Sequence, residues 1–534
     1  MFPEPRNTDN TQTWKQARKW IETCSRPASR PRNEAQERSN HWRCQQSVIE
    51  PELPTRLIRV GQSNADLKLC LTSEMHGRGK ESVRYATVSH CWGKQKFFIT
   101  TDANVARMQQ LIPFESLTKS FQECVIATRR LGLEDVWIDS LCIIQGSKSD
   151  WEIESARMGS VYACCTVNLV AADAHDGTVG CFFDRDPTCG ISVRYDKHKP
   201  DRRTLMCDLE DDLPGLPRMD KCETSKRGWC FQETFLSPRS IYFAKRQIWF
   251  ECRCIFANEM YPEGYMEKDV PNRLYSWRWG TSDNEDTSHA WDFVLETFIK
   301  RSLTYMSDRL VAIGGVARAV EKLMIYSQPQ QSGNRPRYLA GLWGADFELQ
   351  LNWCIQGIVP ETLPLTAPSW SWASVPHGIS RRDSGKTNLK LVNWHVTLDS
   401  QDGFGAVKDG FIELMCQNLV PIAICRERKG NHNRSWYVHL KGRDGEYKKA
   451  IAWIDHPANT PDMQTDLFAL PAFRYQYYYS GLILQSIQGA IDTYRRVGLF
   501  DYTINTPKLE DQAWNPLRPN LEAELEDLII IRIV

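Results

Sequence analysis

Three short apolar runs in the first third of the chain lead directly into polar, reactive side chains. The runs and the residues after them are Tyr85–Ser89 with His90, Cys91, Trp92 and Gly93; 135–139, ending in Asp139, with Ser140, Leu141 and Cys142; and 166–171 with Asp173, His175 and Asp176. Such runs are typical of buried strands. Ligands bind beyond the carboxyl ends of parallel strands, so we expect these side chains to gather along one edge. The alternative is that these side chains form no binding pocket and are simply exposed to solvent along the edge of the sheet.

His90 and Cys91 could support nucleophilic catalysis, because an imidazole lowers the pKa of a neighbouring thiol. Adjacent residues on a strand point to opposite faces, so the two meet only if the chain turns, as Gly93 would allow. The alternative is a buried, inert Cys91 with His90 bonded to backbone. Asp139 could hold a ribose hydroxyl or a catalytic water, or it could cap the following loop.

A second group of candidates lies in residues 227–233, which contain Arg227, Trp229, Cys230 and Glu233. Glu233 could act as a general base or ribose ligand, because a carboxyl in a semi-apolar setting has a raised pKa. The structural alternative is a first-turn glutamate that interacts with the helix dipole.

Alternating strands and helices must position these residues. Residues 113–132 read as a helix with proline at its start and Gly132 at its end. A second helix is predicted to begin at a capping box formed by Ser149 and Glu152. The order strand, helix, strand, helix, strand predicts a parallel sheet with flanking helices.

The rest of the chain divides into segments that differ in composition and hydrophobic pattern. We expect a polar, partly disordered leader over 1–50 with one short helix near Trp14, a first domain over 51–260, and a helical extension over 261–375. A hairpin is predicted over 240–252 and helices over 285–325. From 376 to 534, short alternating runs predict an antiparallel all-β module ending in a buried strand. Trp370 and Trp372 are expected to share one face of a strand and to pack in the core.

Composition narrows the functional classes. The 534 residues carry 66 basic and 66 acidic side chains, and this zero net charge argues against binding to nucleic acid through bulk charge. The 18 cysteines contain no C-x-x-C pair, so we expect free thiols in a reducing compartment and no zinc site of the usual spacing. With no signal peptide or apolar run of 18 residues visible, a cytoplasmic protein without transmembrane segments is expected.

Three blocks of this sequence, in order, resemble the fungal heterokaryon-incompatibility (HET) domain. They are 85–93, 136–145 with 150–162, and 227–233, and together they span about residues 83–235. Blocks at 308–317, 338–343 and 368–374 are similar to the extended form of stand-alone HET proteins. The sequence departs from the family pattern at His90, where tyrosine is common, and at Cys230, where threonine is common. Either change could alter a site or only repack it.

The resemblance implies a role in non-self recognition, with the domain triggering programmed cell death after self-association. It also implies the product of an incompatible allele as a candidate partner. HET domains are also similar to TIR domains, which implies a flavodoxin/TIR-like parallel sheet. It further implies Glu233 as the carboxylate of NAD cleavage. Ser89, His90 and Asp139 would then surround the nicotinamide riboside.

The residues and the resemblance support three hypotheses: an incompatibility effector, an NAD-cleaving hydrolase, and a biosynthetic or hydrolytic enzyme that uses a cysteine with His90. The predicted catalytic residues are Glu233, Asp139, His90 and Cys91. The predicted ligand-binding residues are Ser89, Trp92, Gly93, Cys142, Arg227 and Trp229. No cofactor is predicted, NAD is a possible substrate, and no metal site is predicted.

Overall fold

The computed structural model divides the chain into two compact units. The first contains Met1–Glu285 and Ala312–Leu323, and the second contains Asp286–Val311 and Met324–Val534. The structure describes residues 7–27, 41–45, 52–75, 83–185, 191–194, 204–207, 221–264, 287–327, 336–356, 366–375, 378–381, 385–417, 419–429, 433–441, 447–455, 466–475, 478–503 and 528–534. The predicted domain boundaries near 50 and 376 lie outside these residues, and the predicted four-part division stays a prediction.

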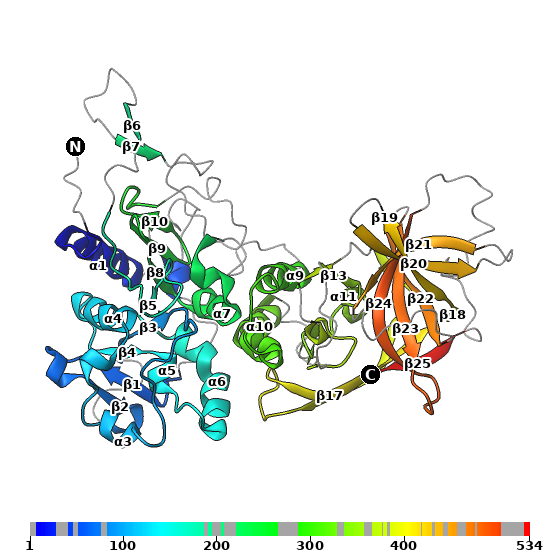
Figure 1. The fold of residues 1–534 in the computed structure, drawn as a ribbon, viewed down its shortest axis with the longest axis horizontal. Helices are drawn as coiled ribbons and strands as arrows, with labels where there is room; N and C mark the ends of the chain where they lie inside the picture. Colours follow the sequence, from blue (N-terminus) through cyan, green and yellow to red (C-terminus); the bar gives the residue numbers. More distant parts are fainter. Residues whose placement is uncertain are drawn as a thin grey trace. The chain divides into compact units, whose positions relative to one another are not determined.

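An eight-stranded mixed sheet forms the centre of the first unit (Figure 1). Its order is β10-β9-β8-β5-β3-β4-β1-β2. The bounds are β1 Arg56–Arg59, β2 Lys68–Leu71, β3 Tyr85–Ser89, β4 Asp135–Trp137, β5 Val167–Val170, β8 Arg239–Phe243, β9 Ile248–Cys252 and β10 Phe256–Asn258. A separate ladder pairs β6 (Ile191–Arg194) with β7 (Thr204–Cys207).

The four central strands are parallel, and the sequence predicts three of them, β3, β4 and β5. β3 pairs with β4 on one side and β5 on the other, and β5 pairs with β8. The outer strands are antiparallel: β1 pairs with β2 and β4, and β9 pairs with β8 and β10. The predicted hairpin over 240–252 is confirmed as β8 and β9. The predicted parallel sheet is therefore confirmed for the centre, and antiparallel strands extend it on both sides.

Helices cover both faces of this sheet, which explains why β3, β4 and β5 are buried along their whole length. In Figure 1, α1 and α4 lie on one side, and α6 and α7 lie on the other. The helices are α1 Thr11–Ser25, α3 Val105–Met108, α4 Lys119–Arg130, α5 Asp139–Cys142, α6 Lys148–Ala163 and α7 Gly228–Leu236, and the 3-10 turns are η1 Trp42–Gln45, η2 Asn64–Asp66, η3 Thr72–Glu74, η5 Phe114–Ser116 and η7 Glu223–Lys226.

Side-chain caps mark where helices α4 and α6 begin. The Thr118 hydroxyl caps α4 by accepting from the Phe121 amide, and Gly132 supplies the left-handed residue after the helix, with φ of 74°. α6 is capped by Ser147, whose side chain accepts from the Asp150 amide. The predicted capping box at Ser149 and Glu152 was therefore wrong, because the helix begins one residue before Ser149.

The second unit combines helices with a large β-sheet. Its helical elements are α9 Thr287–Phe298, both ends of α10 Arg309–Ser327, α11 Phe347–Gln350 and the 3-10 turns η9 Met306–Asp308 and η11 Trp372–Ser374. Two small ladders pair β11 (Tyr338–Leu339) with β12 (Leu342–Trp343), and β13 (Trp353–Ile355) with β14 (Ile379–Arg381). These elements confirm the prediction of helices over 285–325.

An eleven-stranded sheet confirms the predicted C-terminal β module. Its strands are β15 Lys386–Thr387, β16 Lys390–Leu398, β17 Val407–Cys416, β18 Val420–Pro421, β19 Ala423–Lys429, β20 Asn433–Lys441, β21 Tyr447–Ile454, β22 Leu467–Tyr475, β23 Tyr478–Ser486, β24 Thr493–Thr503 and β25 Ile529–Ile533. The pairing is antiparallel except that β25 also runs parallel to β24. β25 is half exposed and not fully buried as predicted.

The tryptophan-rich segment differs from its prediction in conformation. Residues 369–375 form turns and η11, and no strand includes them. Trp370 and Trp372 are nevertheless fully buried, so the prediction of core packing is confirmed. The Trp372 indole donates to the Gly341 carbonyl over 2.8 Å. A strict alternation of serine and tryptophan therefore marked burial here and did not mark a strand.

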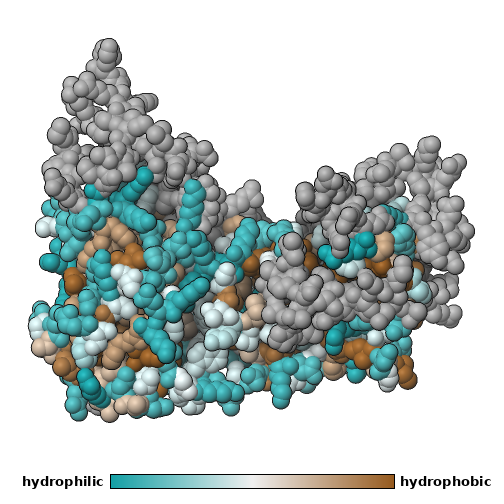
Figure 2. All heavy atoms as spheres, in the orientation of Figure 1, coloured by the Kyte–Doolittle hydropathy of each residue, from teal (hydrophilic) through white to brown (hydrophobic). Residues whose placement is uncertain are grey.

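The visible face in Figure 2 mixes hydrophilic and hydrophobic side chains. Among the helices that the structure describes, none has the length and apolar character needed to cross a membrane.

Arg496 is a fully buried cation in the second unit. Its Nε lies 3.0 Å from Asp455 Oδ2, its Nη1 donates to the Leu351 carbonyl over 2.7 Å, and its guanidinium stacks 3.3 Å from the centre of the Trp353 ring. A buried charge is tolerated only when it is paired in this way.

We expect Arg496→Met to destabilise the second unit by about 3 to 5 kcal/mol, because Asp455 would lose its buried counter-ion. Arg495→Met is the matched control, since Arg495 is exposed on the same strand. Urea unfolding of both variants measures the difference. Equal midpoints for the two variants would contradict a structural role for the buried pair.

Candidate functional site

The end of β3, the start of α5 and helix α7 bring the predicted residues together. Ser89 is the last residue of β3, Asp139 is the first of α5, and Glu233 lies in α7. Ser89, His90 and Glu233 are at most 3% exposed. We refer to Ser89, His90, Asp139, Arg227 and Glu233 as the Glu233 site.

His90 is a neutral imidazole enclosed by aromatic rings. Its ring centre lies 4.8 Å from that of Phe121 in an edge contact and 6.5 Å from that of Trp92 in a stacked one. Burial lowers the pKa of His90 to about 4, although Asp139 opposes this shift. Its Nε2 lies 3.7 Å from Asp139 Oδ1 and has no hydrogen-bond partner within the described part of the chain.

Both carboxylate oxygens of Asp139 accept hydrogen bonds from nearby residues. Its Oδ2 accepts from the Trp92 indole over 2.8 Å, and its Oδ1 accepts from the Ser140 amide over 2.6 Å. These bonds agree with the alternative in which Asp139 organises the following turn. They also fix the Trp92 ring against the loop that leaves β3.

Glu233 is the strongest candidate for acid–base chemistry. Burial raises the pKa of its carboxyl to about 7, opposed by Arg227 and by the Ser89 and Tyr162 hydroxyls. Its Oε2 has no hydrogen-bond partner in the described structure. A carboxyl with this pKa is divided between its protonated and ionised forms near neutral pH, which suits proton transfer.

Arg227 links the loop after β3 to the start of α7. Its guanidinium donates to the His90 carbonyl. Burial acts to lower the pKa of Arg227, but the nearby Cys230, Glu233 and Asp139 raise it overall. Arg227 is thus a fixed positive charge that faces both carboxylates of the site.

Gly93 allows two loops to approach each other. Its φ is 69°, and an added Cβ would lie 2.4 Å from Asp176 Cβ. Asp176 accepts from the Thr178 amide and hydroxyl, and Asp173 accepts from the Lys245 amide. Asp173 and Asp176 therefore stabilise the loop that follows β5, and none of these hydrogen bonds reaches Glu233. His175 is largely exposed beside Asp176.

The predicted thiols are poorly prepared for nucleophilic attack. Burial raises the pKa of Cys91 to about 11, and it also raises the pKa of the fully buried Cys142. Neither group favours the thiolate that attack requires. Cys230 lies with its Sγ 3.9 Å from the His90 carbonyl oxygen, and Trp229 is half-buried.

Sequence reasoning missed three side chains near the site. The Asn168 amide in β5 donates to the Ser89 hydroxyl over 2.9 Å, and the Tyr162 hydroxyl of α6 donates to the Val88 carbonyl over 3.0 Å. Gln232 accepts from the Gly315 amide over 3.2 Å, while its Nε2 has no partner among the described groups. The available signal was Asn168, a polar residue inside an otherwise apolar strand.

Two buried polar atoms of the Glu233 site are available to a ligand or to water. His90 Nε2 and Glu233 Oε2 are buried without hydrogen-bond partners in the described residues, and so is Ser140 Oγ next to Asp139. Such atoms are rare, because each costs free energy unless it binds water, an ion or a ligand. The combination of a neutral imidazole, a carboxyl of raised pKa and a guanidinium can orient a polar ligand and move a proton.

Residues 85–233 match the family model for heterokaryon incompatibility protein (HET). The chain contains a HET domain. The matched segment begins with the first residue of β3 and ends at Glu233, so it includes every residue of the Glu233 site. Neither the curated proteins nor the solved structures include a significant match to the chain.

Glu233→Gln should change how the stability of the HET domain depends on pH. Because burial raises the Glu233 pKa from 4.5 to about 7, the folded chain binds this proton more tightly than the unfolded chain. The contribution of Glu233 protonation to the free energy of unfolding is fully present below pH 4.5. It is lost as the pH rises from 4.5 to about 7, by about 3 kcal/mol in total. The uncharged variant lacks this decline.

Unfolding free energies of the wild type and the variant, compared at each pH from 4.5 to 8, measure this effect. Subtracting the variant's unfolding free energy from that of the wild type cancels the contribution of His90, which both proteins share. Because the His90 pKa falls from 6.5 to about 4 on folding, His90 makes the protein more stable as the pH rises from about 4 to 6.5. Glu115→Gln, at an exposed carboxyl, is the control. A constant difference between wild type and Glu233→Gln at all pH values would show that the Glu233 pKa is ordinary.

Proposed function

We propose that this protein is an effector of fungal heterokaryon incompatibility, which triggers cell death through its HET domain. The match of residues 85–233 to the HET family is the observation that carries the proposal. The buried polar groups of the Glu233 site support it, because they lie within the matched segment and are costly for a purely structural role. The effector acts in the cytoplasm, through self-association of the HET domain or contact with the product of an incompatible allele.

Induced expression of the full chain in a fungal host should reduce viability, and Glu233→Gln should abolish the reduction at equal protein level. Colony counts and a membrane-integrity dye measure the effect. Glu115→Gln, which changes an exposed carboxyl in the same domain, should remain toxic. Normal viability in every pairing of host strains would contradict the effector role, and equal toxicity of Glu233→Gln would remove the site from it.

Hydrolysis of NAD is a second candidate function, and the strand order favours it. In chain order the four parallel strands are β3, β4, β5 and β8, and their order in the sheet corresponds to 2-1-3-4. The flavodoxin-like fold has this order, and its ligand site lies where the order reverses, between the first and third strands. Here that position is the end of β3 and β5. Ser89 ends β3, and its hydroxyl is hydrogen-bonded to the Asn168 side chain from within β5.

The groups of the Glu233 site fit the chemistry of N-glycosidic cleavage. The bond from the ribose C1′ to the nicotinamide nitrogen breaks, and its electron pair leaves with nicotinamide. Ionised Glu233 would stabilise the oxocarbenium-like transition state and accept a proton from the water that attacks C1′. The products are nicotinamide, ADP-ribose and a proton. Arg227 would offset the charge of the substrate's phosphates or of Glu233 itself.

The third hypothesis, a thiol enzyme that uses Cys91 or Cys142, has less support. Burial raises the pKa of both thiols, so the attacking thiolate is disfavoured. His90 is in turn a weak base, because burial lowers its pKa to about 4.

We expect purified full-length protein to release nicotinamide from NAD, and Glu233→Gln to reduce the rate at least about 100-fold, the scale of general-base catalysis. Chromatography of nicotinamide and ADP-ribose measures both products. Glu115→Gln and the thermal transition of each variant control for folding. Equal release by wild type and Glu233→Gln would exclude Glu233 from the mechanism, and no release by the wild type would contradict this second function.

A further inference from the structure

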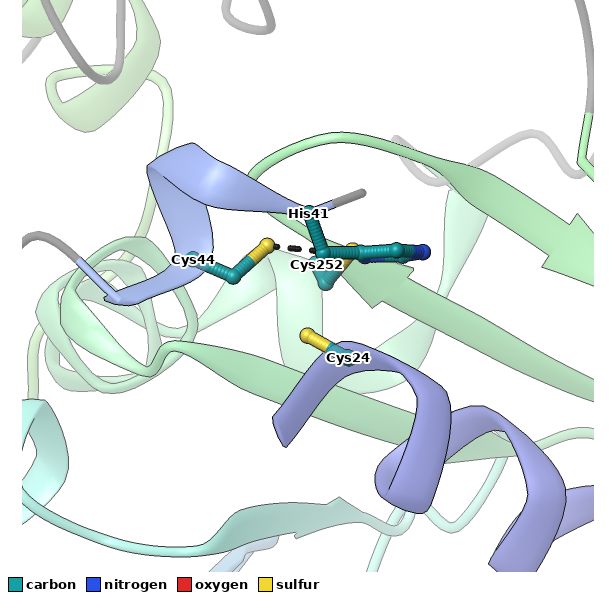
Figure 3. Close-up of side chains that lie close together, drawn as sticks. All are labelled: Cys24, His41, Cys44 and Cys252. Carbon is teal, nitrogen blue, oxygen red and sulfur yellow. Dashed lines mark hydrogen bonds between the residues drawn. The ribbon is translucent and has the colours of Figure 1, made fainter. Parts of the chain in front are cut away.

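Three cysteines and one histidine from distant parts of the sequence meet inside the first unit (Figure 3). Cys24 lies near the end of α1, His41 directly precedes the short turn η1, Cys44 lies within that turn, and Cys252 ends β9. Their Sγ atoms and one imidazole nitrogen all lie within 4.8 Å of one another. We call these four residues the Cys24 cluster.

The ligand atoms are close to the spacing of a tetrahedral metal site, since all of them lie within 4.8 Å of one another. His41 Nδ1 lies 3.3 Å from Cys252 Sγ and 3.7 Å from Cys44 Sγ. In a tetrahedral zinc site the Zn–S and Zn–N bonds are about 2.3 and 2.1 Å, which places neighbouring ligand atoms about 3.4 to 3.8 Å apart. A small adjustment of side chains would bring all four atoms to that distance from a common centre.

The surroundings of the cluster also fit bound metal. Each of the four residues is at most 4% exposed. The backbone amides of Cys254 and Ile255 point at Cys252 Sγ over 3.5 and 3.4 Å. Amide donors of this kind stabilise a thiolate ligand and fix its orientation, which is how outer groups tune metal sites.

The sequence hides this cluster because its ligands do not come in C-x-x-C pairs. His41 and Cys44 form the equivalent local pair, H-x-x-C, which η1 folds onto one side. The remaining ligands come from α1 and from a strand more than 200 residues away. The prediction of no metal site rests on the absence of local cysteine pairs, whereas the fold brings these four residues together from distant parts of the unit.

We propose that Cys24, His41, Cys44 and Cys252 bind one Zn²⁺ ion as a structural site. Three thiolates and one imidazole are a common ligand set of structural zinc sites, and four protein ligands leave no open position for catalysis. The ion would fasten α1 and η1 to β9, and so join the N-terminal segment to the eight-stranded sheet, next to its edge strand β10. This function is independent of the Glu233 site.

Metal analysis of the full chain tests the proposal. Protein purified from zinc-supplemented culture without chelator, then desalted, should contain about one zinc per chain by plasma mass spectrometry. Cys24→Ser and Cys252→Ser should each lower the zinc content at least about fivefold. Cys124→Ser is the matched control, because Cys124 is a buried thiol 3.7 Å from Cys181 and outside the cluster. It should retain its zinc.

A second readout covers the case in which the serine variants do not fold. Replacement of zinc by Co²⁺ in the wild type should give the intense visible bands of tetrahedral thiolate coordination, and a strong chelator should lower the midpoint of thermal unfolding by at least about 5 °C. A wild type that is metal-free as purified, or equal zinc content in Cys24→Ser and Cys124→Ser, would each overturn the proposal.

Discussion

The Glu233 site depends on one constraint: a carboxyl group buried beside the end of β3. Burial raises the pKa of Glu233 to about 7, and the Arg227 guanidinium and Ser89 hydroxyl limit the rise. The neighbouring His90 is kept neutral by the same exclusion of water. Asp139, by contrast, is held by the Trp92 indole and the Ser140 amide, so it shapes the loop around the site. Two carboxylates a short way apart thereby acquire different roles through their surroundings.

Much of the first unit could be predicted from sequence because local signals agreed with one another. The run 85–89 is apolar and β-branched, and it forms β3 between two parallel neighbours. The antiparallel edges were harder to predict, since β1 and β2 are four-residue strands with little periodicity of their own. Trp370 and Trp372 alternate like strand residues, yet they lie in a turn. There the Trp372 indole donates to a core carbonyl, and the Trp370 carbonyl accepts from the Trp353 indole.

The site could be predicted only in part. Ser89 and His90 could be predicted because they stand where a strong strand signal ends. Glu233 could be predicted because it lies in a block that resembles the HET family, although it stands inside α7 and not at its start. Asn168 and Tyr162 act through hydrogen bonds that cross between elements, and no spacing rule reveals such pairs. The Cys24 cluster shows the same limit more strongly: α1, η1 and β9 each supply ligands, and only the three-dimensional structure brings them together. Chemistry assembled by tertiary contacts leaves no periodic trace in the sequence.

The most direct measurement of the central constraint is the titration of the Glu233 carboxyl itself. Infrared difference spectra of the full chain against Glu233→Gln, recorded across pH, isolate the C=O band of this one protonated carboxyl. The structure predicts a band that is strong at pH 6, is lost around pH 7 and is absent from the variant. Loss of the band near pH 4.5, the value of an exposed glutamate, would contradict the account and would leave the Glu233 site without its acid–base group.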